Sequence, residues 1–418
     1  MDLFVGQYFK LNKIVLTICG LWPYQSKLRR RITFAMLASS TLLFIFTLVA
    51  GILSQSKFDF VNTEETFIFI FYCSAGLLKC TILYNQQNKI KKLYERIETD
   101  WKKLTDTSER EILRSFLLEG RKLNFIIMSN YTILLVSCSS AFIIYSCVDF
   151  LPRILKEKSE YHRPHSFPYY FRPMVINEKF YDLQVAVHIT VIVFYAGFVY
   201  MSAIATYISS VKHVCALYEI ARYRLQNAVS YDKSNNSLLV LVEDTSIVPK
   251  LVKVIDMHAQ ALRGIQIIEK VFSADFFVLE ASSLTALATD VYELKYCRAN
   301  VRTFIRALLL TPIVIIYLFF VNYSGEQVIQ ACNDMRITAY NIDWYRTSSR
   351  ARVFVFMIMR RTLNPKYLTA GTIVMILSIE KFAAIITTAW SIGTILLTTQ
   401  RHTRNEDTNV IADNNWLC

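Results

Sequence analysis

The chain has 418 residues, 54% of them hydrophobic, with only 10 Gly and 8 Pro. No stretch rich in Gly, Ser or Pro separates soluble domains, and apolar runs of about 20 residues recur, the length that spans a bilayer. This composition excludes a set of soluble domains joined by linkers and predicts one helical membrane domain. In a soluble protein the net charge of +13 would suggest nucleic-acid binding, but basic residues in short loops between spans account for it here.

The first part of the chain predicts a surface helix followed by two membrane spans. Residues 1–26 contain a short apolar patch with lysines upstream of it, which is typical of an amphipathic helix at the membrane surface. Spans 1 and 2 are predicted at 32–53 and 66–84. Span 2 contains Lys79, which we expect to reach the inner membrane interface by snorkelling.

The next part predicts a long helical segment and an irregular loop. Apolar residues recur at three- and four-residue steps in 85–122, which predicts an amphipathic helix, and span 3 follows at 125–148. Half of the prolines lie in 149–182, so we expect a long outer loop there. Its two histidines, His162 and His165, have no acidic or cysteine partner nearby and do not predict a metal site.

The later spans are less uniformly apolar than the first three. They are predicted at 183–211, 273–292, 304–323 and 368–399. The fifth span carries Asp275, Glu280 and Asp290, which we expect to face the bundle interior or an aqueous cavity. The seventh is dotted with Thr and Ser and carries Glu380-Lys381 near its middle, so we expect it to face something polar: a water-filled pore, another subunit or a ligand.

The distribution of basic residues predicts the orientation. About two thirds of the 46 Lys and Arg residues fall in 1–31, 85–122, 212–270 and 323–367. The positive-inside rule makes these segments cytoplasmic, which places the amino terminus inside and, after seven spans, the carboxyl terminus outside. This is opposite to a G-protein-coupled receptor. The motifs agree, since no Asp-Arg-Tyr follows span 3 and Leu368 stands where an NPxxY motif needs Tyr.

The sequence does not predict catalysis. It carries no GxSxG, HExxH, GxxxxGK or GxGxxG motif, so we predict neither an enzyme nor a bound cofactor. His258 stands near Asp256 on a predicted inner helix, where a surface or interface role is expected rather than general-base chemistry. Glu380-Lys381 leaves a proton relay open, although an intrahelical or intersubunit charge arrangement explains it as well.

Two stretches share the pattern of a known family. The first holds Gly325-Glu326-Gln327, Ala339-Tyr340, Trp344-Tyr345, the basic run to Arg360-Arg361, Asn364-Pro365, Leu368-Thr369-Ala370-Gly371, Leu377-Ser378-Ile379-Glu380, Phe382 and Leu396. The second holds Met257-His258-Ala259-Gln260-Ala261-Leu262 and Ile268-Glu269. On these residues the chain resembles the insect odorant receptors, and in detail the receptor expansions of social Hymenoptera. Length, seven spans and orientation agree along the whole chain.

The resemblance implies an odorant-gated, non-selective cation channel in the dendritic plasma membrane of olfactory neurons, assembled as a tetrameric hetero-oligomer with the odorant co-receptor. Segments of about 212–272 and 324–366 would form a cytoplasmic anchor, although the Arg-rich part also suits a face attracted to anionic lipid. Span 7 would line the pore. The family's gate falls on Ile395, Thr398 and Thr399; Thr399 stands where the co-receptor has a larger apolar residue, which implies a smaller contribution to gating by dewetting.

The resemblance also implies an odorant pocket in the outer half of the bundle, between spans 2, 3, 4 and 6. Helical direction places twelve residues there: Phe67, Ile70, Phe71, Ser74, Cys138, Phe142, Tyr145, His188, Ile192, Tyr195, Ile313 and Ile316. Such a mostly apolar pocket suits a small volatile or hydrocarbon-like ligand. Aromatic packing within the bundle is the alternative reading of the same residues.

Two other functions remain open on the sequence. A gustatory receptor-like channel of the same superfamily would share fold and mechanism but differ in ligand and partner. A secondary transporter would show internal repeats and spans broken by Gly or Pro, whereas no repeat is evident and Pro312 is the only proline within a predicted span.

Overall fold

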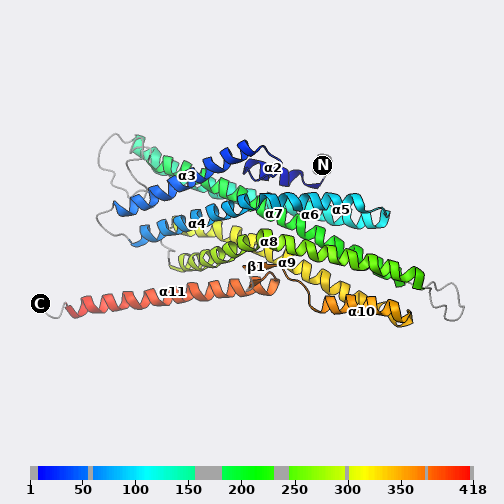
Figure 1. Cartoon of the computed structure of the whole chain (residues 1–418). Helices are drawn as coiled ribbons and strands as arrows, with labels where there is room; N and C mark the ends of the chain where they lie inside the picture. Colours follow the sequence, from blue (N-terminus) through cyan, green and yellow to red (C-terminus); the bar gives the residue numbers. More distant parts are fainter. Residues whose placement is uncertain are drawn as a thin grey trace.

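The computed structural model describes residues 8–54, 60–155, 181–229, 244–296, 301–371 and 375–414, and almost all of these are helical (Figure 1). Seven helices in this part of the chain are long and apolar enough to cross a membrane, which agrees with the seven predicted spans. In chain order the elements are α2 (Lys10–Ile18), α3 (Lys27–Leu53), α4 (Phe60–Asn85), α5 (Gln87–Lys103), α6 (Thr107–Leu155), α7 (Tyr181–Val229), α8 (Asp244–Tyr296), α9 (Val301–Asn341), η3 (Trp344–Arg346), α10 (Ser349–Leu363), β1 (Thr369–Ala370), β2 (Met375–Ile376) and α11 (Ile379–Asn414).

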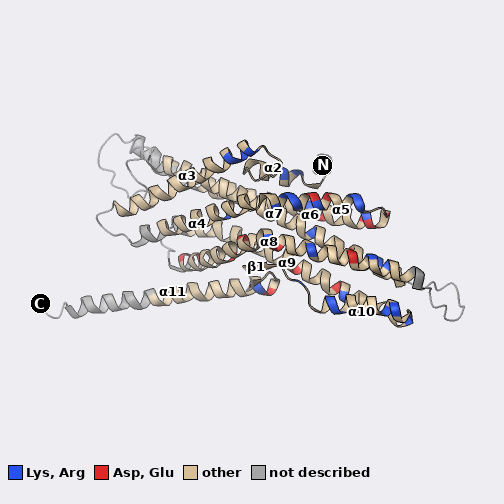
Figure 2. Cartoon of the chain, in the orientation of Figure 1, with Lys and Arg blue, Asp and Glu red and all other residues tan. Residues whose placement is uncertain are grey.

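Four helices are much longer than a bilayer is thick. Helices α6 and α7 have 49 residues each, α8 has 53 and α9 has 41. At 1.5 Å per residue they measure about 60–80 Å, against about 30 Å of hydrocarbon. They therefore continue beyond the apolar layer as one bundle. Figure 2 shows charged residues concentrated in this extension, around α5 and α10, while the other half of the bundle is mostly uncharged where it is described.

The continuity of these helices changes the boundaries expected in the middle of the chain. The amphipathic segment 85–122 divides at a bend between α5 and α6, and its second part joins span 3 without a break in α6. The outer loop was predicted from residue 149, whereas α6 continues to Leu155. Residues 156–180, which include His162 and His165, lie outside the described residues.

Helix α2 packs into the bundle through a buried polar network. The side-chain amide of Asn12 donates to the Ala205 carbonyl and to Ser209 Oγ on α7, both at 3.0 Å. Asn124 on α6 donates to the same two acceptors. The opposite face of α2 exposes Ile14, so α2 is amphipathic as predicted. It is nevertheless fixed to α6 and α7 and does not lie only at the surface.

The prediction that the seventh span starts at residue 368 is wrong. Strands β1 and β2 form an antiparallel hairpin there, in which Thr369 pairs with Ile376. Gly371 has a φ of +72°, a left-handed conformation that glycine adopts without a steric penalty. The hairpin turns the chain ahead of α11, which then packs against α8 and α9 (Figure 1).

Because α11 begins at Ile379, Glu380 and Lys381 lie elsewhere in the span than predicted. Ser378 Oγ accepts a hydrogen bond from the Lys381 amide at 3.2 Å, as an N-capping residue does. Glu380 lies in the first turn of the helix, where the helix dipole favours an acid. Glu380-Lys381 therefore lies at the start of the span and not near its middle.

Candidate functional site

A cavity of about 180 Å³ lies inside the bundle. Six helices contribute to its wall: α3, α4, α6, α7, α8 and α9. Aliphatic and aromatic side chains dominate the lining, among them Phe44, Tyr131, Leu135, Ile189, Ile192, Tyr195, Tyr200, Leu279, Ile313 and Tyr317. The described part of the bundle thus forms an apolar pocket between α4, α6, α7 and α9, with further walls from α3 and α8.

Small residues on facing helices leave room for this cavity. Gly76 on α4 lies opposite Ala196 on α7, and both line the cavity. A Cβ on the neighbouring Gly197 would lie only 2.3 Å from Leu135 Cδ1, so a larger residue there would force the Leu135 side chain to move. Small side chains at these positions permit close helix packing on one side and empty space on the other.

The cavity contains few polar groups. Thr41 Oγ1 donates to the Leu37 carbonyl of its own helix at 2.9 Å, and Ser282 Oγ donates to the Leu279 carbonyl at 3.0 Å. A hydroxyl that donates once still has lone pairs that accept a hydrogen bond. The arrangement suits a mainly apolar molecule that carries at most one or two hydrogen-bond donors.

The predicted ligand residues divide between two places. Three of them, Ile192, Tyr195 and Ile313, line the cavity. Four others line a separate hollow at the surface between α4 and α8 instead: Phe67, Ile70, Phe71 and Ser74. A different set of α4 residues lines the cavity: Phe69, Tyr72, Cys73, Gly76 and Leu77.

The remaining predicted residues are not part of the cavity lining where they are described. His188 packs edge to face against Phe44, with 4.9 Å between the ring centroids. Cys138 is buried on α6, and Ile316 is half-buried on α9. The side chains of Phe142 and Tyr145 lie outside those that the structure describes.

Sequence reasoning missed the contributions of α3 and α8. Thr41 on α3 and Ser282 and Ser283 on α8 line the cavity. The adjacent serines in a span that also carries three acids were the available signal, because small polar residues in a membrane helix usually face the protein interior.

The acids of the fifth span are buried, as expected. Asp275, Glu280 and Asp290 all have little exposure, and Asp290 accepts a hydrogen bond from Thr311 Oγ1 at 2.9 Å.

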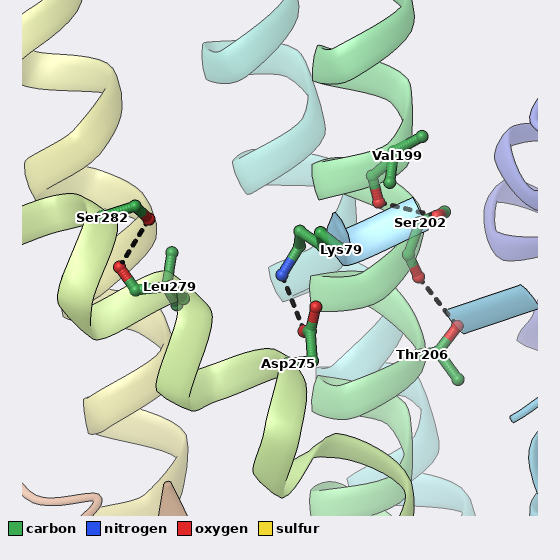
Figure 3. Close-up of polar contacts among 7 residues, drawn as sticks. All are labelled: Lys79, Val199, Ser202, Thr206, Asp275, Leu279 and Ser282. Carbon is green, nitrogen blue, oxygen red and sulfur yellow. Dashed lines mark hydrogen bonds and ion pairs between the residues drawn. The ribbon is translucent and has the colours of Figure 1, made fainter. Parts of the chain in front are cut away.

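The prediction that Lys79 snorkels is wrong. Its Nζ lies 2.7 Å from Asp275 Oδ2 in the bundle interior (Figure 3), because an ion pair supplies the neutralisation that the interface would otherwise provide.

The hairpin before α11 is held by α8 on one side. Thr369 Oγ1 donates to Glu269 Oε1 at 2.6 Å, and the Gly371 amide donates to the Ser273 carbonyl at 3.0 Å. Glu269, Thr369 and Gly371 belong to the two stretches on which the sequence resemblance rests. Residues about 100 positions apart in the chain therefore meet in one cluster.

Helix α9 holds the hairpin from the other side. The Ser378 amide donates to Asn322 Oδ1 and the Ile379 amide donates to Glu326 Oε2, both at 3.3 Å. A Cβ on Gly325 would lie 2.3 Å from the Leu377 carbonyl oxygen, so the backbones approach as closely as glycine allows. The shared sequence pattern thus specifies how α8, α9 and the start of α11 are joined.

Comparison with known proteins identifies the family. Residues 59–390 match the family model described as 7tm Odorant receptor. The chain belongs to this odorant receptor family. Among curated proteins, no sequence matches the chain.

The odorant receptor fold extends over almost the whole chain. The structure of the insect olfactory receptor OR5 from Machilis hrabei matches with a TM-score of 0.71 and 14% identity, over 96% of this chain and 100% of that one. The same receptor in complex with eugenol matches with a TM-score of 0.74 and 12% identity, over the same shares. The predicted family and the seven-span helical fold are confirmed, and the chain is a multi-pass membrane protein.

Proposed function

We propose that this odorant receptor is the ligand-binding subunit of an odorant-gated, non-selective cation channel, and that it works as a tetrameric hetero-oligomer with the odorant co-receptor. The observation that carries the proposal is the apolar cavity among α4, α6, α7 and α9, at the place where the family resemblance leads us to expect an odorant. The chain has no enzymatic role in this proposal.

The volume and lining of the cavity indicate the ligand class. A cavity of about 150 Å³ lined by apolar residues accommodates benzene, and this cavity measures about 180 Å³. We therefore propose a single-ring or short-chain volatile with a mainly apolar body. Ile192, Tyr195 and Ile313 are the predicted residues we assign to ligand contact, together with Phe69, Cys73 and Ser282.

Helix α11 is the candidate pore wall. Ile395, Thr398 and Thr399 are all exposed in the single chain, and Ile395 is 61% exposed. Both threonine hydroxyls donate to the Ile395 carbonyl of their own helix. The Thr398 hydroxyl retains lone pairs that can accept a hydrogen bond from water or coordinate a cation. An apolar side chain beside hydroxyls, exposed until other subunits surround it, supports a gate formed with the co-receptor.

The long-helix extension and α10 are the candidate assembly anchor, over about 212–272 and 324–366. Large apolar side chains are exposed on this part of the chain, in contrast to a typical soluble surface. They include Tyr340, Tyr345, Val353, Phe356, Met357 and Leu363. Helix α10 also carries the exposed arginines Arg350 and Arg360, and this mixture of apolar and basic side chains supports a subunit interface.

The charge distribution supports the proposed orientation of the receptor. Lys and Arg residues concentrate in the extension (Figure 2), which the positive-inside rule places in the cytoplasm. The amino terminus would then be cytoplasmic and the end of α11 extracellular, in the plasma membrane of an olfactory neuron dendrite. An amino-terminal epitope tag should stain only permeabilised cells.

Patch-clamp recording tests the channel function. Cells expressing the receptor with and without the co-receptor are exposed to a panel of single-ring and short-chain volatiles, in the presence of a G-protein inhibitor. We expect cation currents within milliseconds when both subunits are present. Normal surface expression without current across the panel would contradict the proposal, and saturable uptake without current would indicate a transporter.

A further inference from the structure

A buried ion pair lies one helical turn from the cavity lining. Lys79 on α4 and Asp275 on α8 form it (Figure 3). Their side chains are only 1% and 0% exposed. Gly76 precedes Lys79 by three residues and Leu279 follows Asp275 by four, and both line the cavity. The pair therefore joins α4 to α8 at the end of the cavity.

Packing alone gives no reason for two charges at this place. Removing an ion from water costs several kcal/mol, and apolar residues of similar volume often replace a buried ion pair without loss of stability. Asp275 Oδ1 is buried and has no hydrogen-bond partner among the described residues. A costly and incompletely satisfied ion pair at membrane depth points to a functional role.

The ammonium group lies behind two aromatic rings of the cavity wall. Lys79 Nζ is 4.8 Å from the centroid of the Tyr200 ring on α7 and 5.3 Å from that of the Tyr317 ring on α9. Both distances fall within the range of about 6 Å for cation–π attraction. The two rings meet edge to face at 5.2 Å and both line the cavity. A ligand that displaces either ring therefore changes the surroundings of the ammonium group.

Asp275 belongs to the turn of α8 that holds the hairpin. Ser273, two residues earlier, exchanges two hydrogen bonds with Gly371. Phe277, two residues later, places its Cδ2 atom 3.2 Å from the position that a Cβ on Gly371 would take. The 273–277 turn thus contacts the ion pair on one side and the segment leading into α11 on the other.

We propose that Lys79 and Asp275 are positioning residues that fix Tyr200 and Tyr317 in the cavity wall and transmit ring displacement to the hairpin before α11. This inference rests on the proposed function, because it gives the odorant cavity a route to the candidate pore helix. When a ligand moves a ring, the ammonium group follows it and draws Asp275 along through the ion pair. The 273–277 turn then shifts against Gly371.

Hydrogen–deuterium exchange of the full-length receptor in lipid nanodiscs tests the route without a ligand. Lys79→Met and Asp275→Asn each remove one charge with little change in volume. We expect each to increase exchange of the peptide carrying the Gly371 amide by about fivefold or more, the lower end of typical coupling between sites. The double variant should increase exchange by no more than the single variants, because it breaks the same contact and leaves no unpaired buried charge.

Lys212→Met is the matched control. Lys212 is also buried, pairs with Glu119 and lies 6.0 Å from the centroid of the Phe116 ring, but its partners are on α6. We expect it to increase exchange in α6 peptides and to leave the hairpin peptide unchanged.

A second arm uses eugenol as a single-ring probe. Saturating eugenol should change the exchange of the hairpin peptide in the wild type, while Lys79→Met should still bind eugenol, measured by equilibrium dialysis, without that change. A residue with only a structural role would not separate binding from the response of the hairpin.

Several results would overturn the inference. Unchanged hairpin exchange in Lys79→Met and Asp275→Asn is one, and an equal increase in Lys212→Met is another, because it would indicate general loosening. If Lys79→Met does not fold, the nearly isosteric Asp275→Asn decides. Failure of eugenol to bind the wild type would count against the proposed cavity ligand class, whereas the first arm would still decide the route.

Discussion

Ser273 and Gly371 exchange two hydrogen bonds between α8 and the hairpin before α11. The Gly371 amide donates to the Ser273 carbonyl at 3.0 Å, and Ser273 Oγ donates to the Gly371 carbonyl at 2.8 Å. Both polar groups of the Gly371 backbone are therefore satisfied by one residue that lies 98 positions away. This reciprocal contact fixes the hairpin before α11 to α8, one of the helices that form the cavity wall.

Replacement of Gly371 should weaken this junction. Gly371→Ala places a Cβ at a φ of +72° and 3.2 Å from Phe277 Cδ2. The left-handed conformation costs about 1–2 kcal/mol for a residue with a Cβ. We expect a lower melting temperature of the purified receptor and smaller odorant-evoked currents. Gly76→Ala is the control, since its Cβ would lie 3.8 Å from Ala196, in ordinary contact, and a melting temperature lowered equally by both variants would contradict the explanation.

Replacement of Gly325 should disrupt the same junction from the α9 side. A Cβ there would lie 2.3 Å from the Leu377 carbonyl oxygen and 2.6 Å from Leu377 Cβ. Because the first obstacle is backbone, α9 and the hairpin must separate to relieve the overlap. We expect Gly325→Ala to abolish current and to increase proteolysis between β2 and α11, measured on the purified receptor. Wild-type currents in this variant would show that the close approach is not required.

The cavity predicts which face of α4 and α7 determines odorant selectivity. Ile192→Ala removes wall atoms from the cavity, and one methylene in an apolar pocket changes selectivity by about tenfold or more. We expect the half-maximal concentration to rise for the best single-ring agonist and to fall for bulkier ones. Phe67→Ala should change neither, because Phe67 is 58% exposed in the separate hollow. The reverse pattern in dose–response curves would place the pocket on the other face of α4.

The extension of the long helices should depend on one bidentate ion pair. Arg224 Nε and Nη2 on α7 donate to the two carboxylate oxygens of Glu109 on α6 at 2.6 and 2.7 Å. Charge-assisted hydrogen bonds in this geometry contribute about 1–3 kcal/mol. We expect Arg224→Met to lower the free energy of unfolding by that amount, measured by denaturation in detergent.

An exposed pair gives the comparison. Lys91 and Glu95 lie one turn apart on α5, 3.6 Å from each other and about half exposed. Lys91 also lies 5.5 Å from the centroid of the Tyr24 ring, so Lys91→Met should cost less than about 1 kcal/mol in total. Equal losses in the two variants would show that burial and bidentate geometry do not matter here.

The sequence by itself determined the class of the molecule. Seven apolar runs of bilayer length predicted the spans, because hydrophobic length is a local property of the chain. The distribution of Lys and Arg along the chain predicted which segments lie together on one side of the apolar layer. Figure 2 shows these residues concentrated in the extension of the long helices. The glycines and polar residues around Gly325 and Gly371 carried the family pattern, and their close contacts explain why those residue types occur there.

Only the tertiary structure decided how the helices are rotated and paired. The apolar residues of α4 are not confined to one face, so periodicity does not specify which face meets α7. The predicted residues Phe67 and Phe71 lie in the surface hollow. The start of α11 was likewise undetermined, because an apolar run that reads as a continued span is held as a hairpin by α8 and α9. Lys79 pairs with Asp275, which lies 196 positions away in the chain. Such pairings depend on long-range packing, which a single sequence records only as isolated charges in apolar spans.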